Sequence, residues 1–112
     1  AMSAWYCGNL GMQVVHRMNK AIFLADETGH GIIEIYNNPV DDVPEYTAMD
    51  PLQLHLDFQS SNLKSDRERL MSAGASPAGP EFNPEIEFGI VFLKDPWGFT
   101  IQFVRREQNF LP

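Results

Sequence analysis

The stretch FLKDPWGFTIQFV, residues 92–104, decides how this chain folds. Two apolar runs flank residues 94–98, whose composition is typical of a turn, so the stretch predicts a β-hairpin. The second run carries one polar amide, Gln102, between Ile101 and Phe103. Side chains alternate between the two faces of a strand, so Gln102 points away from the face of its apolar neighbours. Gln102 is therefore either a solvent-facing residue or part of a site.

Length, composition and charge narrow the class of protein. The 112 residues suit one domain, and 44% of them are apolar, which is enough for a sizeable core. A net charge of -7 repels phosphate backbones and argues against nucleic acid as a partner. No apolar run is long enough to span a membrane, and no signal segment opens the chain. Together with the lone Cys7, these features predict a cytoplasmic protein with no membrane contact.

The first half of the chain predicts a helix and a meander of three strands. The helix covers residues 3–11, and β-branched or apolar runs predict strands at 12–18, 21–25 and 32–36. Residues 26–31 contain two glycines and form the last turn of the meander. Glu34 lies at the centre of the third strand, between apolar neighbours.

The second half repeats this architecture with one strand more at its start. Residues 52–58 alternate, with leucines on one face and His55 and Asp57 on the other, which predicts a strand. A helix follows at 62–73, then a proline-broken edge segment at 76–84, then the hairpin. We expect one domain, 1–112, with a first module at 3–38, a linker at 39–51 and a second module at 52–106. The halves share negligible sequence identity, so the repeat is expected to be architectural only.

Several pieces together resemble the vicinal oxygen chelate superfamily, which includes glyoxalase I, extradiol dioxygenases, and fosfomycin- and bleomycin-resistance proteins. They are SAWYCGNLGMQVVHR, GIIEIYNNP, HLDF with a helix ending LMSAGA, and FLKDPWGFTIQFV. The resemblance covers residues 3–106. It implies an α+β fold of paired βαβββ modules, with curled mixed sheets around a cavity. The first strand of the first module is missing from this chain, which leaves a sheet edge open.

The resemblance also implies ligands for a divalent metal such as Fe, Mn, Ni or Zn. Carried over by position, they are Glu34, His55 and Gln102, and the fourth would precede residue 1. Imidazole and carboxylate groups suit these metals. Most members have a glutamate where this chain has Gln102, and a neutral amide attracts a cation less strongly. Glu34 would serve also as the catalytic base.

Each candidate residue also has an ordinary structural interpretation. Glu34 and Gln102 could face solvent on half-exposed strands, and His55 could be a hydrogen-bonded histidine without a ligand. Trp5 and Trp97 are packing residues or walls of a substrate pocket. Asp57 shares the face of His55, where it is solvated, contacts substrate or orients the imidazole.

Two functions from different classes follow from the resemblance. The first is a metal-dependent lyase, isomerase or dioxygenase-like enzyme acting on a small molecule. The second is a metal-free protein of the bleomycin-resistance type that binds and sequesters an aromatic or cationic compound. The open sheet edge predicts a homodimer, with exchange of a strand or module between copies as one form of it.

Overall fold

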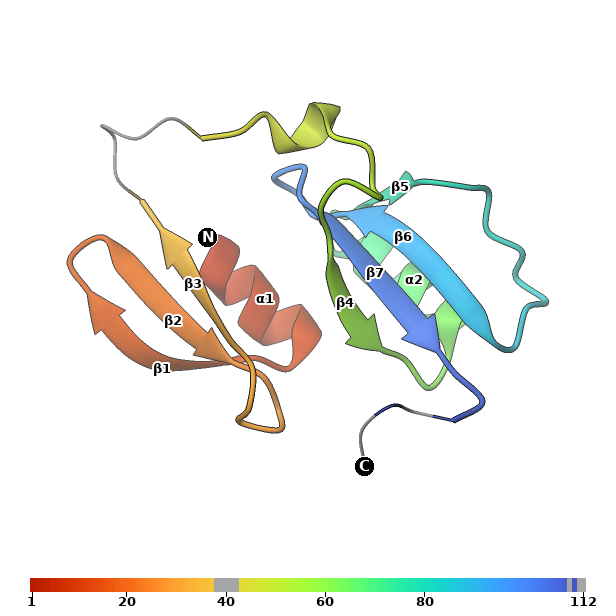
Figure 1. The fold of residues 1–112 in the computed structure, drawn as a ribbon, viewed down its shortest axis with the longest axis horizontal. Coiled ribbons are helices and arrows are strands. Elements are labelled where there is room, and N and C mark those ends of the chain that lie inside the picture. Colours follow the sequence, from red (N-terminus) through yellow and green to blue (C-terminus); the bar gives the residue numbers. More distant parts are fainter. Residues whose placement is uncertain (38–42, 109, 111–112) are drawn as a thin grey trace. The chain divides into compact units, whose positions relative to one another are not determined.

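The computed structural model of the chain describes residues 1–37, 43–108 and 110, and Figure 1 gives the order of their elements. The chain divides into two compact units, Ala1–Pro44 and Glu45–Pro112. Helices and strands occur in both units, which confirms an α+β fold. The curl of the sheets about a cavity stays a prediction. No helix in the described ranges is long and apolar enough to cross a membrane.

The first unit contains a helix and a three-stranded antiparallel sheet. Helix α1 (Met2–Leu10) ends at Gly11, whose φ of 66° is a left-handed conformation that glycine adopts without strain. The sheet has the order β1-β2-β3, with β1 (Gln13–Met18), β2 (Ala21–Ala25) and β3 (Ile32–Tyr36), which confirms the predicted meander. Tyr6 of α1 and Leu24 of β2 are almost fully buried, so this small unit has its own core.

The second unit is a complete βαβββ module preceded by the short 3-10 helix η1 (Tyr46–Ala48). Its elements are β4 (Leu56–Gln59), α2 (Leu63–Ser72), β5 (Ser76–Ala78), β6 (Gly89–Lys94) and β7 (Thr100–Arg105). The sheet order is β4-β7-β6-β5, and β4 runs parallel to β7 while the other pairs are antiparallel. The proline-broken segment forms the edge strand β5, as the sequence predicts.

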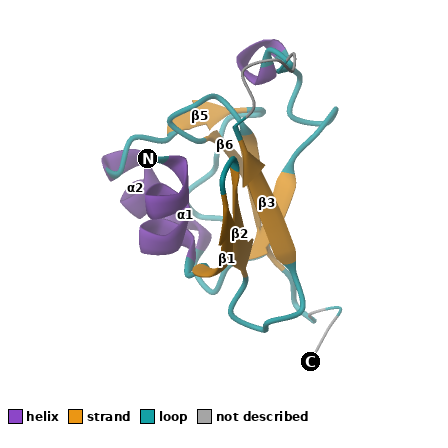
Figure 2. Ribbon diagram, turned by 90° about the vertical axis from the view of Figure 1, so that its left-hand side faces the viewer, coloured by secondary structure: helices purple, strands orange, loops and turns teal. Residues whose placement is uncertain are grey.

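Helix α2 covers one face of this sheet. Helix α2 contacts both β6 and β7, and Figure 2 shows it to one side of β6. Leu70 of α2 and Leu93 and Ile101 of the hairpin are 0% exposed, so the core of the unit lies between helix and sheet. The Asn62 side chain caps α2 by accepting a hydrogen bond from the Ser65 backbone N–H at 3.0 Å.

The predicted strand at 52–58 is wrong in its first half. β4 begins only at Leu56, and Leu52 of the expected buried face is 75% exposed. Asp50 causes the difference, because its carboxylate accepts from the Leu52 N–H at 2.8 Å and its carbonyl accepts from the Gln53 N–H at 2.9 Å. These bonds close a turn, and the alternation of leucines inside it does not reflect strand faces.

The hairpin at 92–104 forms with the predicted turn, and Asp95 is the residue that holds it. Asp95 is 2% exposed, and its carboxylate accepts from the backbone N–H groups of Trp97 and Phe99, each at 2.9 Å. Gly98 supplies a φ of 90° that the turn requires. The Lys94 ammonium donates to the carbonyls of Tyr46 and other residues, which attaches η1 to this turn.

The turn between β2 and β3 repeats the same design around Asp26. Its carboxylate accepts from the Gly31 N–H at 3.3 Å and from the Thr28 hydroxyl at 2.7 Å. The hydrogen bond from Thr28 is the main reason that the pKa of Asp26 lies below its ordinary value of 3.8. IFLAD in β2 and VFLKD in β6 precede the two turns, so the internal repeat extends to the sequence of the hairpins.

Candidate functional site

The sheet of the second unit has a face that α2 does not cover, and we call it the open face. On β7, Ile101 and Phe103 are buried on the α2 side, and Gln102 alternates to the open face. The strand register places Asp57 of β4 and Phe92 of β6 directly beside Gln102, one on each side. An acid, an amide and an aromatic ring therefore form one row across three strands.

His55 joins this row from the residue just before β4. Its ring lies 5.4 Å from the ring of Phe92, at an interplanar angle of 77°. Its Nδ1 lies 2.8 Å from the carbonyl oxygen of Pro51. Because a carbonyl only accepts, Nδ1 carries the proton in this contact and Nε2 keeps a free lone pair. Metal-binding and base histidines are oriented by this kind of bond. The half-buried imidazole can thus accept a proton or coordinate a cation.

Gln102 is held by Asp57, and Asp57 is held in turn by Arg106. The Gln102 Nε2 donates to Asp57 Oδ1 at 3.0 Å, and an Arg106 nitrogen lies 3.4 Å from Asp57 Oδ2. The carbonyl oxygen Oε1 of Gln102 stays available for a ligand. Asp57 is exposed, and its partners are Gln102 and Arg106, while Pro51 orients the imidazole of His55. Its contact with a substrate stays a prediction.

The neighbouring acid gives a physical reason for an amide at position 102. A glutamate there would place two carboxylates directly opposite each other on adjacent strands, which is unfavourable. Gln102 instead donates a hydrogen bond to the charged group of Asp57, and such bonds are stronger than those between neutral groups. The negative charge of this row therefore lies on β4 and not on β7.

Glu34 occupies in the first unit the place that Gln102 has in the second. It lies at the centre of β3, directly opposite Phe23 of β2, as Gln102 lies opposite Phe92. The Glu34 side chain is exposed. Glu34 belongs to the first unit and His55 to the second, so the predicted participation of both in one site stays a prediction.

The two tryptophans predicted to contact substrate lie in different units, Trp5 in the first and Trp97 in the second. Trp5 of α1 is half-buried and packs edge-on against Tyr6, with ring centroids 5.4 Å apart. Trp97 lies in the β6–β7 turn and is 41% exposed. Their contact with a ligand stays a prediction. The sequence did not single out Arg106. Its one signal is strand alternation, which places positions 102, 104 and 106 on the same face.

Whether these residues fit a metal depends on their donor atoms. His55 offers Nε2 and Gln102 offers Oε1, whereas the two oxygens of Asp57 are engaged by Gln102 and Arg106. Among the residues that the structure describes, no group of three His, Cys, Asp or Glu side chains could hold a metal ion. The second unit thus offers two donor groups, one imidazole and one amide. A site for a divalent cation needs at least one further ligand, such as a carboxylate.

Comparison with known proteins supports the fold assignment. A family described as a glyoxalase-like domain matches residues 1–104. No curated protein matches the chain. The fosfomycin resistance protein FosX from Listeria monocytogenes is similar in structure, with a TM-score of 0.66 and 12% identity over 96% of this chain and 82% of FosX.

Two further solved structures share the fold at low identity. Glyoxalase I from Leishmania major gives a TM-score of 0.64 and 20% identity, over 90% of this chain and 73% of that one. TnmS3, an antibiotic binding protein from Streptomyces sp. CB03234, gives a TM-score of 0.60 and 17% identity, over 92% of this chain and 82% of that one. At these identities the likeness concerns the fold alone.

Proposed function

The chain belongs to the glyoxalase-like domain family of the vicinal oxygen chelate superfamily, and from this premise we propose that it handles a small molecule on its open face. The observation that carries the proposal is the orientation of His55. Its Nδ1–H is fixed on the Pro51 carbonyl, and its ring rests against Phe92, next to the free carbonyl oxygen of Gln102. Two acceptor atoms, Nε2 of His55 and Oε1 of Gln102, thus lie on one surface beside the apolar ring of Phe92.

The finer proposal is a metal-dependent lyase, isomerase or dioxygenase-like enzyme. His55 through Nε2, Gln102 through Oε1 and the carboxylate of Glu34 would hold a divalent cation. When bound, such a cation supplies Lewis-acid polarisation of a substrate oxygen. The residues of the row orient one another: the Phe92 ring packs edge-on against the imidazole, and Asp57 holds the Gln102 amide through a hydrogen bond. Glu34 would accept the substrate proton as general base.

Metal uptake by the purified protein tests this proposal directly. Protein prepared without chelator is titrated with Mn²⁺, Ni²⁺, Zn²⁺ and Fe²⁺, and bound metal is quantified by elemental analysis. We expect close to one equivalent, lost on His55→Ala and weakened on Glu34→Gln. His30→Ala is the matched control, because His30 lies in the exposed β2–β3 turn. Uptake below a tenth of an equivalent for every metal would refute metal dependence.

A second candidate function is binding without a metal, which the Asp57–Gln102 contact favours. That contact leaves a neutral acceptor beside an acid, and Phe92 and the 48%-exposed Ile90 lie on the same face of β6. Such a surface suits an apolar ligand that carries a hydrogen-bond donor or a positive charge. A thermal-shift screen should then find aromatic cations that raise the melting temperature. Stabilisation by divalent metals alone would contradict it.

The predicted homodimer rests on the outer edge of β3. In the second unit the corresponding strand, β7, is paired on both sides, by β6 and β4. Among the described residues β3 is paired only with β2. An unpaired edge is a template for another strand, so we propose that a second copy covers it. Sedimentation should give a dimer mass at micromolar concentration, and a monomer would contradict this.

A further inference from the structure

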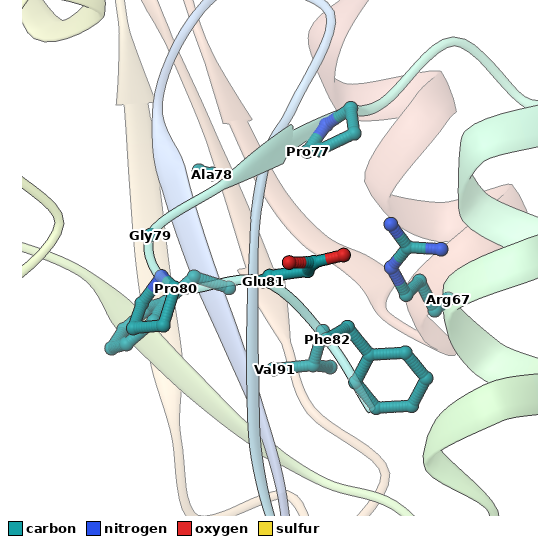
Figure 3. A pocket seen from close by; sticks show the side chains of 9 residues that line it. Arg67, Pro77, Ala78, Gly79, Pro80, Glu81, Phe82 and Val91 are labelled. Carbon is teal, nitrogen blue, oxygen red and sulfur yellow. The ribbon is translucent and has the colours of Figure 1, made fainter. Parts of the chain in front are cut away.

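A pocket lies beside α2 in the second unit, and both Val91 and Phe92 of β6 line it. It has a volume of about 270 Å³ and is formed entirely within the second unit, by α2, β5, the segment that follows β5, and β6 (Figure 3). This volume is just below the roughly 300–1,000 Å³ of sites for drug-sized ligands, so it suits a smaller molecule. Its walls include Arg67, Glu81, Phe82 and Val91.

The charges of α2 single out Arg67. Lys64 pairs with Glu68 at 3.0 Å, and Arg69 pairs with Asp66 at 3.4 Å. In the described part of the chain, Arg67 alone among these five side chains has no ion-pair partner within 4.0 Å. It is half-buried and faces the pocket and not the solvated outer side of the helix.

Arg67 contacts an aromatic ring in a way that leaves its donors free. The guanidinium carbon lies 5.2 Å from the centre of the Phe82 ring. The face of an aromatic ring attracts the positive charge of a guanidinium, but the guanidinium N–H groups still need hydrogen-bond acceptors. A partly desolvated cation of this kind binds a carboxylate well, because the charge-assisted bonds replace lost hydration.

Glu81 supplies the opposite charge on the same pocket. Figure 3 shows its carboxylate pointing toward Arg67 from the segment after β5. Within the described residues, no hydrogen bond or ion pair joins Glu81 to another side chain. The pocket therefore presents a donor group and an acceptor group near each other, next to the apolar surfaces of Phe82 and Val91.

We propose that this pocket binds a small zwitterion of the α-amino-acid type with an apolar side chain. Its carboxylate accepts hydrogen bonds from Arg67, its ammonium donates to Glu81, and its side chain packs on Phe82 and Val91. A simple anion is repelled by Glu81, and a simple cation is repelled by Arg67. Only a ligand with both charges meets both groups. The pocket shares Phe92 with the open face, but its charged groups, Arg67 and Glu81, are not part of the row there, so the proposal does not depend on the proposed function.

A series of three ligands tests the proposal on the full chain. L-Phenylalanine carries both charges, 3-phenylpropionate lacks the ammonium, and 2-phenylethylamine lacks the carboxylate. Binding is followed by amide NMR shifts of Gly79 and Phe82, which lie on the pocket wall. We expect L-phenylalanine to bind with a Kd on the order of 1 mM, at least about tenfold tighter than either relative. Equal binding of all three, or no binding, would overturn the proposal.

Two variants should move the affinities in different ways. Arg67→Met should abolish binding of L-phenylalanine. Glu81→Gln should weaken L-phenylalanine but strengthen 3-phenylpropionate, because it removes the repelling carboxylate. Arg69→Met is the matched control, since Arg69 pairs with Asp66 on the same helix, and it should bind as the wild type does. Unchanged affinity in Arg67→Met would overturn the proposal, and if a variant fails to fold the ligand series decides alone.

Discussion

Replacing Gln102 by glutamate tests the contact that fixes the open face. In the wild type the Gln102 amide donates to Asp57 Oδ1 at 3.0 Å. A glutamate removes the donor and places a second carboxylate beside the first, at directly paired positions of β4 and β7. Two effects should therefore destabilise the variant: the loss of the hydrogen bond and the repulsion between the two carboxylates.

The expected magnitude follows from the exposure of the pair. A hydrogen bond to a charged group contributes about 1.5–3 kcal/mol, and the 38% exposure of the Asp57 side chain points to the lower end or below, about 1 kcal/mol. Repulsion between unit charges about 4 Å apart adds about 1 kcal/mol in well-hydrated surroundings. The free energy of unfolding should fall by about 2 kcal/mol, which lowers Tm by roughly 8 °C in a domain of this size.

Urea denaturation of Gln102→Glu, Asp57→Asn and the double variant measures this coupling. The double variant exchanges the charges between the two strands and should recover most of the loss. The cost should shrink below about pH 4, where carboxylates are protonated. A Gln102→Glu variant as stable as the wild type at pH 7, or a double variant no better than the single one, would refute the reasoning.

Three further predictions concern the turns. Lys94→Met should cost about 2 kcal/mol, because it leaves carbonyls around η1 without their donor, and hydrogen exchange in η1 should accelerate. Gly98→Ala should cost more than about 1 kcal/mol in urea denaturation because of its φ of 90°, whereas Gly8→Ala, with open space in α1, should stabilise. The Asp26 carboxylate stabilises the folded state at pH values above the pKa it has in the unfolded chain. This stabilisation is lost as the pH falls through the lower pKa that it has in the folded state. Thr28→Val should raise the folded-state pKa, which an NMR titration measures.

Local signals in the sequence predicted most elements of the fold. The turn around Asp26 and the hairpin turn at Asp95 form as expected, because each is held by bonds between residues at most five positions apart. The strand at 52–58 was the failure. Its alternating leucines fit a strand, but hydrogen bonds to the carboxylate and the carbonyl of Asp50 close a turn there and outweigh the pattern.

The partners of the site residues could be predicted only in part. The face shared by His55, Asp57 and Gln102 followed from the resemblance and from alternation. The bond of His55 to Pro51 did not, because it depends on the course of the chain through a turn that was predicted as a strand. The lack of an ion-pair partner for Arg67 within the described residues could not be predicted either, since a run of charges on a helix gives no sign of which charge stays unpaired.

The sequence by itself determined the two hairpins, their turns and the family of the chain, because these depend on short-range chemistry and on motif order. The tertiary structure decided what Gln102 does. Its amide meets Asp57 across 45 positions of sequence, through the parallel pairing of β4 with β7. Such a contact depends on strand order, which local patterns do not encode. That pairing gives the physical reason why an amide suits position 102 better than an acid.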